Sequence, residues 1–185
     1  NGISIMSLAS MLPSLALAPF AVPLTRRFGK KELGVFGSLC GAVSCFFLFF
    51  LHTKSMWTYI IVNIIGFLGF GIFNLIMWAI ITDIIDDREV ASGHREDGTI
   101  YAVYSFARKV GQAVAGGLGG WALGWIGFDS LAQVQTQSVV EGIYTISTLI
   151  PAILYSIVFL ALAFIYPLNK SRVQANIATL KERKK

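Results

Sequence analysis

Five long apolar segments alternate with short polar segments along the chain. Each is close to the roughly 20 apolar residues that a helix needs to cross a hydrocarbon layer about 30 Å thick. Lipid-exposed strands or loops of this length are excluded, because each unpaired backbone group in hydrocarbon costs several kcal/mol. The pattern therefore predicts an all-α polytopic membrane protein, with transmembrane helices at about 3–24, 33–51, 56–82, 99–126 and 143–167.

The five segments are predicted to form one transmembrane bundle over residues 1–169, followed by a basic tail over residues 170–185. In the tail, Val173, Ile177 and Leu180 recur at helical spacing with Lys and Arg between them. This spacing is typical of an amphipathic helix that lies on a membrane surface. No separate function is expected for the tail.

The composition supports a membrane protein. Of 185 residues, 55% are hydrophobic and 14% are charged, whereas a soluble domain has about 45–50% apolar and about 25% charged residues. A disordered chain is excluded by the same comparison. The net charge of +5 is carried by short clusters beside apolar segments. An anionic membrane leaflet is therefore a better partner than nucleic acid, which we do not expect the chain to bind.

Lys and Arg are concentrated in alternate connecting segments. The loop after the first predicted helix, the loop after the third and the C-terminal tail together hold twelve, while Lys54 stands alone on the opposite side. Positively charged loops remain in the cytoplasm. We therefore expect a multi-pass protein of the cell (plasma) membrane, with its first residue outside and its C-terminus in the cytoplasm. Because the sequence starts at Asn1 without a signal peptide, we expect it to begin inside a longer protein.

Arg108 and Lys109 lie near the middle of the predicted helix 99–126. A charge at the centre of a bilayer costs about 2.5–3.5 kcal/mol on insertion scales. At least one of the two side chains should therefore face a bundle interior or an aqueous cavity. Ser105 and Gln112 lie on the same helix face as Lys109, with Arg108 at its edge, and the four residues are candidates for a substrate-binding or coupling site.

The small residues Gly116, Gly120 and Gly124 continue this helix and are typical of close helix–helix packing. No Asp or Glu lies within the five predicted helices to pair with Lys109. An unpaired buried cation is strongly disfavoured, so we expect its carboxylate in a part of the protein outside this sequence. The pairing either serves transport, which we favour because charge within a membrane is usually functional, or only holds helices together.

The predicted helix 56–82 carries a polar stripe of Asn63 and Asn74, with Trp78 one turn beyond Asn74. Amides bind hydroxyl groups, and aromatic rings stack on the apolar face of a sugar. These three residues are candidates for the wall of a sugar site. The alternative is that the two amides only make hydrogen bonds between helices.

The segment 83–97, DIIDDREVASGHRED, is expected to be a charged cytoplasmic loop. It contains no HExxH pattern or other specific metal-ligand spacing, so a gate of salt bridges is favoured over an enzymatic site built around His94. The candidate gate residues are Asp83, Asp86, Arg95 and Asp97.

Two motifs resemble those of a known family. RRFGKK at 26–31 resembles the second copy of the short basic loop motif of the major facilitator superfamily. The segments WAIITDIIDD and REDGTIYAVYSFARKVGQAVAGGLGGWALGWIGF, between Trp78 and Phe128, resemble the glycoside–pentoside–hexuronide:cation symporter family, which includes the melibiose and glucuronide permeases. The resemblance covers the whole chain and implies that its five helices match helices eight to twelve of a twelve-helix fold.

The resemblance also implies a mechanism in which two six-helix bundles alternate access to a central sugar site. Lys109 matches a lysine that faces acidic residues of the second helix in this family, and Ser105 matches a small hydroxyl residue near the same site. The charged loop matches the family's cytoplasmic gate. Asn74 stands where the melibiose permease type has Trp, so specificity for galactosides is not implied.

We therefore predict the C-terminal part of a Na⁺- or H⁺-coupled sugar or glycoside symporter, and not an enzyme. The missing N-terminal bundle is expected to bind most of the coupling ion, and no resident cofactor or metal is expected. Besides an enzyme, the alternative is a membrane scaffold or assembly subunit in which Arg108 and Lys109 pair with a partner helix.

Overall fold

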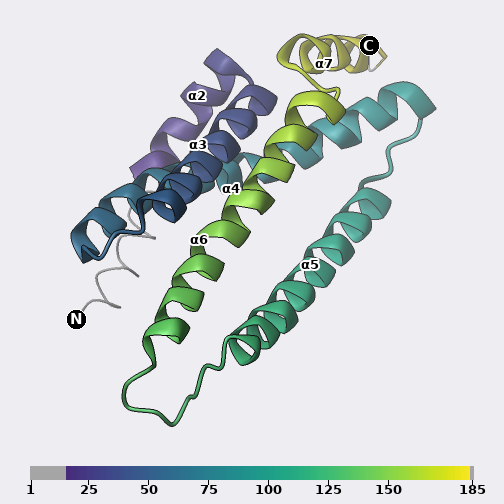
Figure 1. Ribbon diagram of the computed structural model, residues 1–185. Helices are drawn as coiled ribbons and strands as arrows, with labels where there is room; N and C mark the ends of the chain where they lie inside the picture. The colour runs from purple at the N-terminus through teal and green to yellow at the C-terminus, as the bar shows by residue number, and fades with distance from the viewer. Residues whose placement is uncertain (1–15, 184–185) are drawn as a thin grey trace.

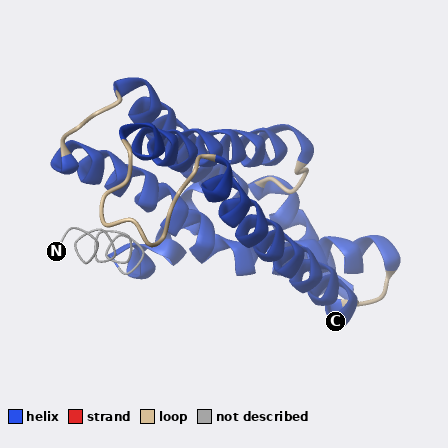
Figure 2. Cartoon of the chain, turned by 60° about the horizontal axis from the view of Figure 1, so that its bottom comes forward, coloured by secondary structure: helices blue, strands red, loops and turns tan. Residues whose placement is uncertain are grey.

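The computed structural model describes residues 16–183, and in this range every regular element is a helix (Figure 2). The all-α prediction is confirmed. The elements are the 3-10 turn η1 (Ala18–Phe20), the α-helices α2 (Ala21–Phe28), α3 (Lys30–Leu51), α4 (Met56–Ser92), α5 (Asp97–Trp125) and α6 (Gln137–Leu160), the π-helical turn η2 (Ala161–Ile165) and the helix α7 (Lys170–Arg183).

Three of these helical segments are long and apolar enough to cross a membrane: α3, α4 and the continuous segment α6–η2. α5 has 29 residues but does not reach the same apolar composition, because charged and glycine residues interrupt it. Much of the first predicted helix, residues 3–15, lies outside the described residues. The division into five membrane helices therefore stays a prediction.

The loop expected at 83–97 is shorter than predicted. α4 continues to Ser92, so residues 83–92 are helical, and the turn to α5 begins at Gly93, which adopts a φ of 77°. No Gly or Pro occurs between Gly71 and Gly93. A 37-residue helix is about 55 Å long and exceeds the hydrocarbon thickness. Asp83 and Asp86 therefore lie on the end of a long helix and not in a flexible loop.

The loop after the first predicted helix is also shorter than expected. α2 ends at Phe28 and α3 begins at Lys30, so Gly29 alone connects them. Its φ of 102° lies in a region that residues with a side chain rarely adopt. The basic motif is thus a helix end, one glycine and a helix start.

α3 packs between α4 and α6, and glycine allows the closest approach. A Cβ atom added at Gly37 of α3 would lie 2.6 Å from the backbone oxygen of Gly69 on α4. Close backbone crossings of this kind are typical of membrane helices. On the other side of α3, the hydroxyl of Tyr144 on α6 donates a hydrogen bond of 2.6 Å to the carbonyl of Leu48. Figure 1 shows these three helices side by side.

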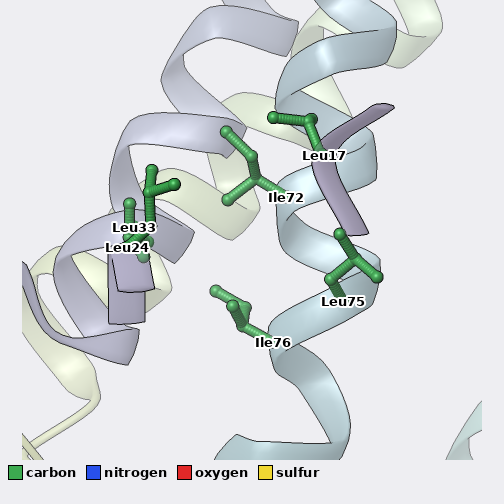
Figure 3. Close-up of a pocket in the computed structure, with 6 residues that line it drawn as sticks. All are labelled: Leu17, Leu24, Leu33, Ile72, Leu75 and Ile76. Atoms are coloured by element: carbon green, nitrogen blue, oxygen red, sulfur yellow. The ribbon is translucent and has the colours of Figure 1, made fainter. Parts of the chain in front are cut away.

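Apolar side chains of α2, α3 and α4 fill the space where these helices meet. Leu33, Ile76 and Ile80 are buried there. A small hollow of about 10 Å³ beside them is lined only by aliphatic side chains, which point toward one another in Figure 3. A hollow barely large enough for one water molecule has no room for a sugar. The lining residues are Leu17, Leu24, Leu33, Ile72, Leu75 and Ile76.

α5 lies at the edge of the bundle (Figure 1) and has no buried residue. Its contact with α4 is made by rings near its start. Trp78 lies edge-on to Tyr104 with 5.5 Å between ring centres, and 6.3 Å from Tyr101. Most of the α5 surface is therefore uncovered by the described residues.

The tail forms the predicted helix, α7, which crosses the end of α4 at the top of Figure 1. Asn176 and Leu180 are buried, whereas Ile177 is 41% exposed. The tail therefore docks on the protein through a face that includes an asparagine, and not only through the expected apolar stripe. Contact of α7 with a membrane surface stays a prediction.

Candidate functional site

One face of α5 is polar and uncovered. Ser105, Lys109 and Gln112 follow one another at helical spacing, so they share a face, and Arg108 borders it. All four side chains are exposed. As the sequence predicted, the four residues lie on one continuous helix, α5. We call Ser105, Lys109 and Gln112 the α5 polar face.

Within residues 16–183, no carboxylate lies within salt-bridge distance of Arg108 or Lys109. The glycines that follow on the same helix are equally uncovered, since a Cβ atom added at Gly116, Gly120 or Gly124 would meet nothing within 4 Å. The described residues thus supply neither a partner for the charges nor a neighbour for the glycine seam.

Trp78 is the site candidate on α4 that the structure brings next to α5. Trp78 contacts the rings of Tyr101 and Tyr104 on α5. Tyr101 lies one helical turn before Ser105, so Trp78 lies beside α5 close to the start of the polar face. The two tyrosines were not among the predicted site residues. Their spacing of three in the segment TIYAVYSF is the signal that marks them, because residues at this spacing lie side by side on a helix.

The two asparagines of α4 lie apart from each other, and the bonds that the described residues make with them are to their own helix. Asn74 is exposed and donates to the carbonyl of Phe70 at 3.2 Å. Asn63 is half-buried and donates to the carbonyl of Tyr59 at 3.0 Å. Eleven residues of helix separate the two amides by about 17 Å. Within the described residues, neither makes the interhelical hydrogen bond that the alternative interpretation requires.

The end of α4 carries a dense cluster of charges around Arg95. Its guanidinium lies 3.0 Å from Asp86, 2.8 Å from Glu89 and 2.8 Å from Asp97. These carboxylates raise the pKa of Arg95 above its usual range, because they stabilise its charged form. Three of the four predicted gate residues therefore meet in one cluster, with Glu89 as a further member that the sequence did not reveal.

The fourth predicted gate residue, Asp83, has a different partner. Its carboxylate is 2.6 Å from the ammonium of Lys30, which also donates to the carbonyl of Ala79 at 3.1 Å. The residue Asp83 is only 4% exposed. The pair joins the start of α3 to α4 across the bundle. Lys30 was not among the predicted site residues, although its basic motif and the acidic segment were predicted to lie on the same side of the membrane.

α7 adds a third set of contacts at the same end. The guanidinium of Arg172 donates to both oxygens of Asp87, at 3.0 and 3.2 Å. Asn176 donates to the same carboxylate at 2.8 Å. The guanidinium of Arg183 donates to the carbonyls of Glu89 and Val90. The three segments rich in Lys and Arg thus meet at one end of the helices.

Within the part of the chain that the structure describes, no three His, Cys, Asp or Glu side chains are grouped so that they could hold a metal ion. The backbone N–H of His94 bonds to the hydroxyl of Ser92 at 3.2 Å. The distinctive features are the uncovered cationic helix face and the charged helix end.

The long apolar helices α3, α4 and α6–η2 are typical of an α-helical membrane protein. The chain belongs to the MFS/sugar transport protein family, whose model matches residues 1–170. The predicted relation to the glycoside–pentoside–hexuronide:cation symporters of the major facilitator superfamily is confirmed.

Curated relatives align with almost all of this chain. It is 30% identical over 176 residues to a glucuronide carrier protein homolog of Escherichia coli, and the aligned region covers 95% of the chain and 38% of the relative. It is 33% identical over 180 residues to a putative sulfoquinovose importer of Salmonella typhimurium, covering 97% of the chain and 37% of the relative. A putative 2,3-dihydroxypropane-1-sulfonate exporter of the same organism is 30% identical over 178 residues, covering 96% and 38%. The chain thus spans less than two fifths of these relatives.

Proposed function

We propose that this chain is the C-terminal part of a secondary transporter that couples uptake of a sugar or glycoside to Na⁺ or H⁺. The observation that carries the proposal is the α5 polar face, a cationic surface on a long helix in a family of sugar transporters. Relatives named as a glucuronide carrier and a sulfoquinovose importer support a sugar-like substrate with an acidic group.

Lys109 pairs in this proposal with a carboxylate from the remaining part of the protein. A cation at bilayer depth requires a partner, and within residues 16–183 none lies within salt-bridge distance. The coupling ion competes with Lys109 for that carboxylate. When the ion binds, Lys109 is released toward the cavity, where its charge attracts an anionic sugar. When ion and sugar leave, the pair forms again and stabilises the empty carrier.

The sugar site lies between α4 and α5. Trp78 offers an aromatic surface on which a sugar ring stacks, while Asn74, Ser105 and Gln112 bind hydroxyl groups. Asn63 lies about 17 Å from Asn74 along α4 and is reached only by a longer glycoside. The bundle rocks against the missing N-terminal bundle to open this site to each side in turn. Asp83, Asp86, Arg95 and Asp97 act at the cytoplasmic end, where their ion pairs hold the helix ends together when the site faces outward.

The proposal is tested with the full-length protein in proteoliposomes that carry an imposed Na⁺ or H⁺ gradient. Radiolabelled methyl glucuronide and sulfoquinovose serve as probes. Lys109→Ala is expected to abolish gradient-driven accumulation of the transported probe, while its membrane insertion equals that of the parent protein. Lys54→Ala is the matched control, since it removes a lysine from the loop between α3 and α4, which contains no other Lys or Arg.

Normal accumulation by Lys109→Ala would refute the coupling role of this lysine. If neither gradient drives any probe, and Lys109→Ala instead disrupts a stable complex with another membrane protein, the scaffold alternative is correct. Measuring accumulation with gradients of both directions separates an importer from an exporter.

A further inference from the structure

A pocket of about 270 Å³ opens at the end of the bundle where the α2–α3 turn meets α7. Asp83 is the one predicted site residue that lines it. Its charged lining residues come from four different helices. Those that carry the argument are Arg26, Lys30, Asp83, Leu168, Lys170 and Val173.

The pocket has an excess of positive charge. Three cations and one acid line it, and Asp83 is already paired with Lys30 at 2.6 Å. The remaining cations are Arg26 and Lys170. Arg26 makes no ion pair within residues 16–183. Lys170 donates one hydrogen bond, to the carbonyl of Arg27 at 2.9 Å, and an ammonium has two further donors.

Two helices also begin at this pocket. α3 starts at Lys30, and its N-cap Gly29 has no side chain to cap the first backbone amides. α7 starts at Lys170, where Asn169 caps the amide of Arg172 at 2.9 Å. The positive ends of two helix dipoles therefore add to the charge of the side chains. Glu32, the acid in the first turn of α3, has its carboxylate beside Gly29, where it partly offsets the dipole of α3; the residue also lines a separate apolar pocket.

The other wall of the pocket is apolar and comes from Leu168 and Val173. Leu168 is only 3% exposed, so this wall is firmly packed. The pocket has cations on one side and aliphatic groups on the other, at the ends of helices that are long and apolar enough to cross a membrane. Basic pockets between such helices bind the headgroups of anionic lipids.

We propose that this pocket binds the phosphate group of an acidic phospholipid, held by Arg26 of α2 and Lys170 of α7. The phosphate bridges two helices that belong to opposite ends of the sequence. It adds to the direct bond between Lys170 and Arg27 and fixes the tail helix against the α2–α3 turn. This binding site does not depend on which solute the protein transports.

The test uses the full-length protein in detergent and native mass spectrometry with stepwise addition of lipid. Dioleoyl phosphatidylglycerol is the probe, dioleoyl phosphatidylcholine the neutral lipid control, and inorganic phosphate the soluble competitor. The double variant Arg26→Gln, Lys170→Gln removes both cations. Lys54→Gln, Lys181→Gln removes the same amount of charge from outside the pocket, and Arg26→Lys keeps the charge in place.

Phosphatidylglycerol is expected to bind the parent protein more tightly than phosphatidylcholine. A cation near an anionic lipid surface contributes enough for about a fivefold change in affinity, so the pocket double variant should weaken binding by about 25-fold. The control double variant and Arg26→Lys should stay within about twofold of the parent protein.

Three outcomes overturn the proposal. Equal weakening by the two double variants would show that binding depends on overall charge and not on the pocket. Equal affinity for the two lipids would show that no anion is recognised. Full displacement of phosphatidylglycerol by an equal concentration of inorganic phosphate would show that the pocket serves a soluble phosphate and not a lipid.

Discussion

The ammonium of Lys30 and the carboxylate of Asp83 lie 2.6 Å apart, although 53 positions separate them in the chain. Asp83 is buried, and the Lys30 side chain is 28% exposed. Removing one partner of such a pair leaves the other charge in a poorly solvated position, which is strongly destabilising. The pair therefore holds the start of α3 against α4.

The first prediction concerns the energy of this pair. Asp83→Asn and Lys30→Gln should each lower the thermal stability of the purified full-length protein. The double variant should be less destabilised than the sum of the two, with a coupling energy of about 1–3 kcal/mol. Thermal unfolding of the four proteins in one detergent measures this cycle. Additive effects would show that the two charges do not interact.

The second prediction concerns the docking of α7. Arg172 donates to both oxygens of Asp87, but both side chains are partly exposed, so the pair contributes up to about 1 kcal/mol. Arg172→Gln should increase hydrogen exchange of the amides in residues 174–183 by up to about fivefold. Lys181→Gln is the matched control on the same helix and should change little. Unchanged exchange in Arg172→Gln would mean that the other contacts of α7, made by Lys170, Asn176, Leu180 and Arg183, fix the tail.

The third prediction concerns the crossing of α3 and α4. A Cβ atom at Gly69 would overlap the carbonyl oxygen of Gly37, so Gly69→Ala must push two helix backbones apart. Overpacking of a core typically costs about 1–3 kcal/mol. The fraction of protein that stays monodisperse after heating should fall clearly for Gly69→Ala.

Gly66→Ala provides the control on the same helix. A Cβ atom there would lie 3.4 Å from the Cβ of Ser44, which is an ordinary contact. This variant should retain the heat resistance of the parent protein. If both variants behave alike, the close crossing at Gly37 and Gly69 does not determine stability.

The fourth prediction concerns the spacing of α4 and α5. The rings of Trp78 and Tyr104 are 5.5 Å apart, so Trp78→Cys and Tyr104→Cys together should be joined readily by a bifunctional thiol reagent long enough to replace the two rings. The experiment uses a background in which Cys40 and Cys45 are replaced by alanine, since both are free thiols. A split-chain form of the full-length protein reveals the cross-link on a gel.

Trp78→Cys with Phe106→Cys is the control pair for the fourth prediction. Phe106 is 71% exposed and lies on a different side of α5 from Tyr101, so it should cross-link much more slowly. Equal rates for the two pairs would show that α5 has no fixed orientation toward α4.

Much of the site was predictable because it depends on local spacing. Residues 105, 109 and 112 share a helix face in any α-helix, and the cost of charge in hydrocarbon marks Lys109 without any tertiary information. The partners of the acidic segment were not predictable in this way. Lys30 and Arg172 contact Asp83 and Asp87 across 53 and 85 positions, and only the packing of α3 and α7 on α4 decides which cation meets which acid.

The sequence by itself determined that the chain is helical, apolar and built for a membrane, since hydrophobic length and the cost of unpaired backbone groups leave no alternative. The tertiary structure decided how far α4 extends, because an unbroken helix continues until Gly93 regardless of where the apolar residues end. It also decided that α7 docks on the protein through Asn176 and Leu180, a contact that depends on the position of Asp87 on another helix. The helical period determines which residues share a face of each helix. Which residues pack against that face depends on contacts between segments that are far apart in the sequence.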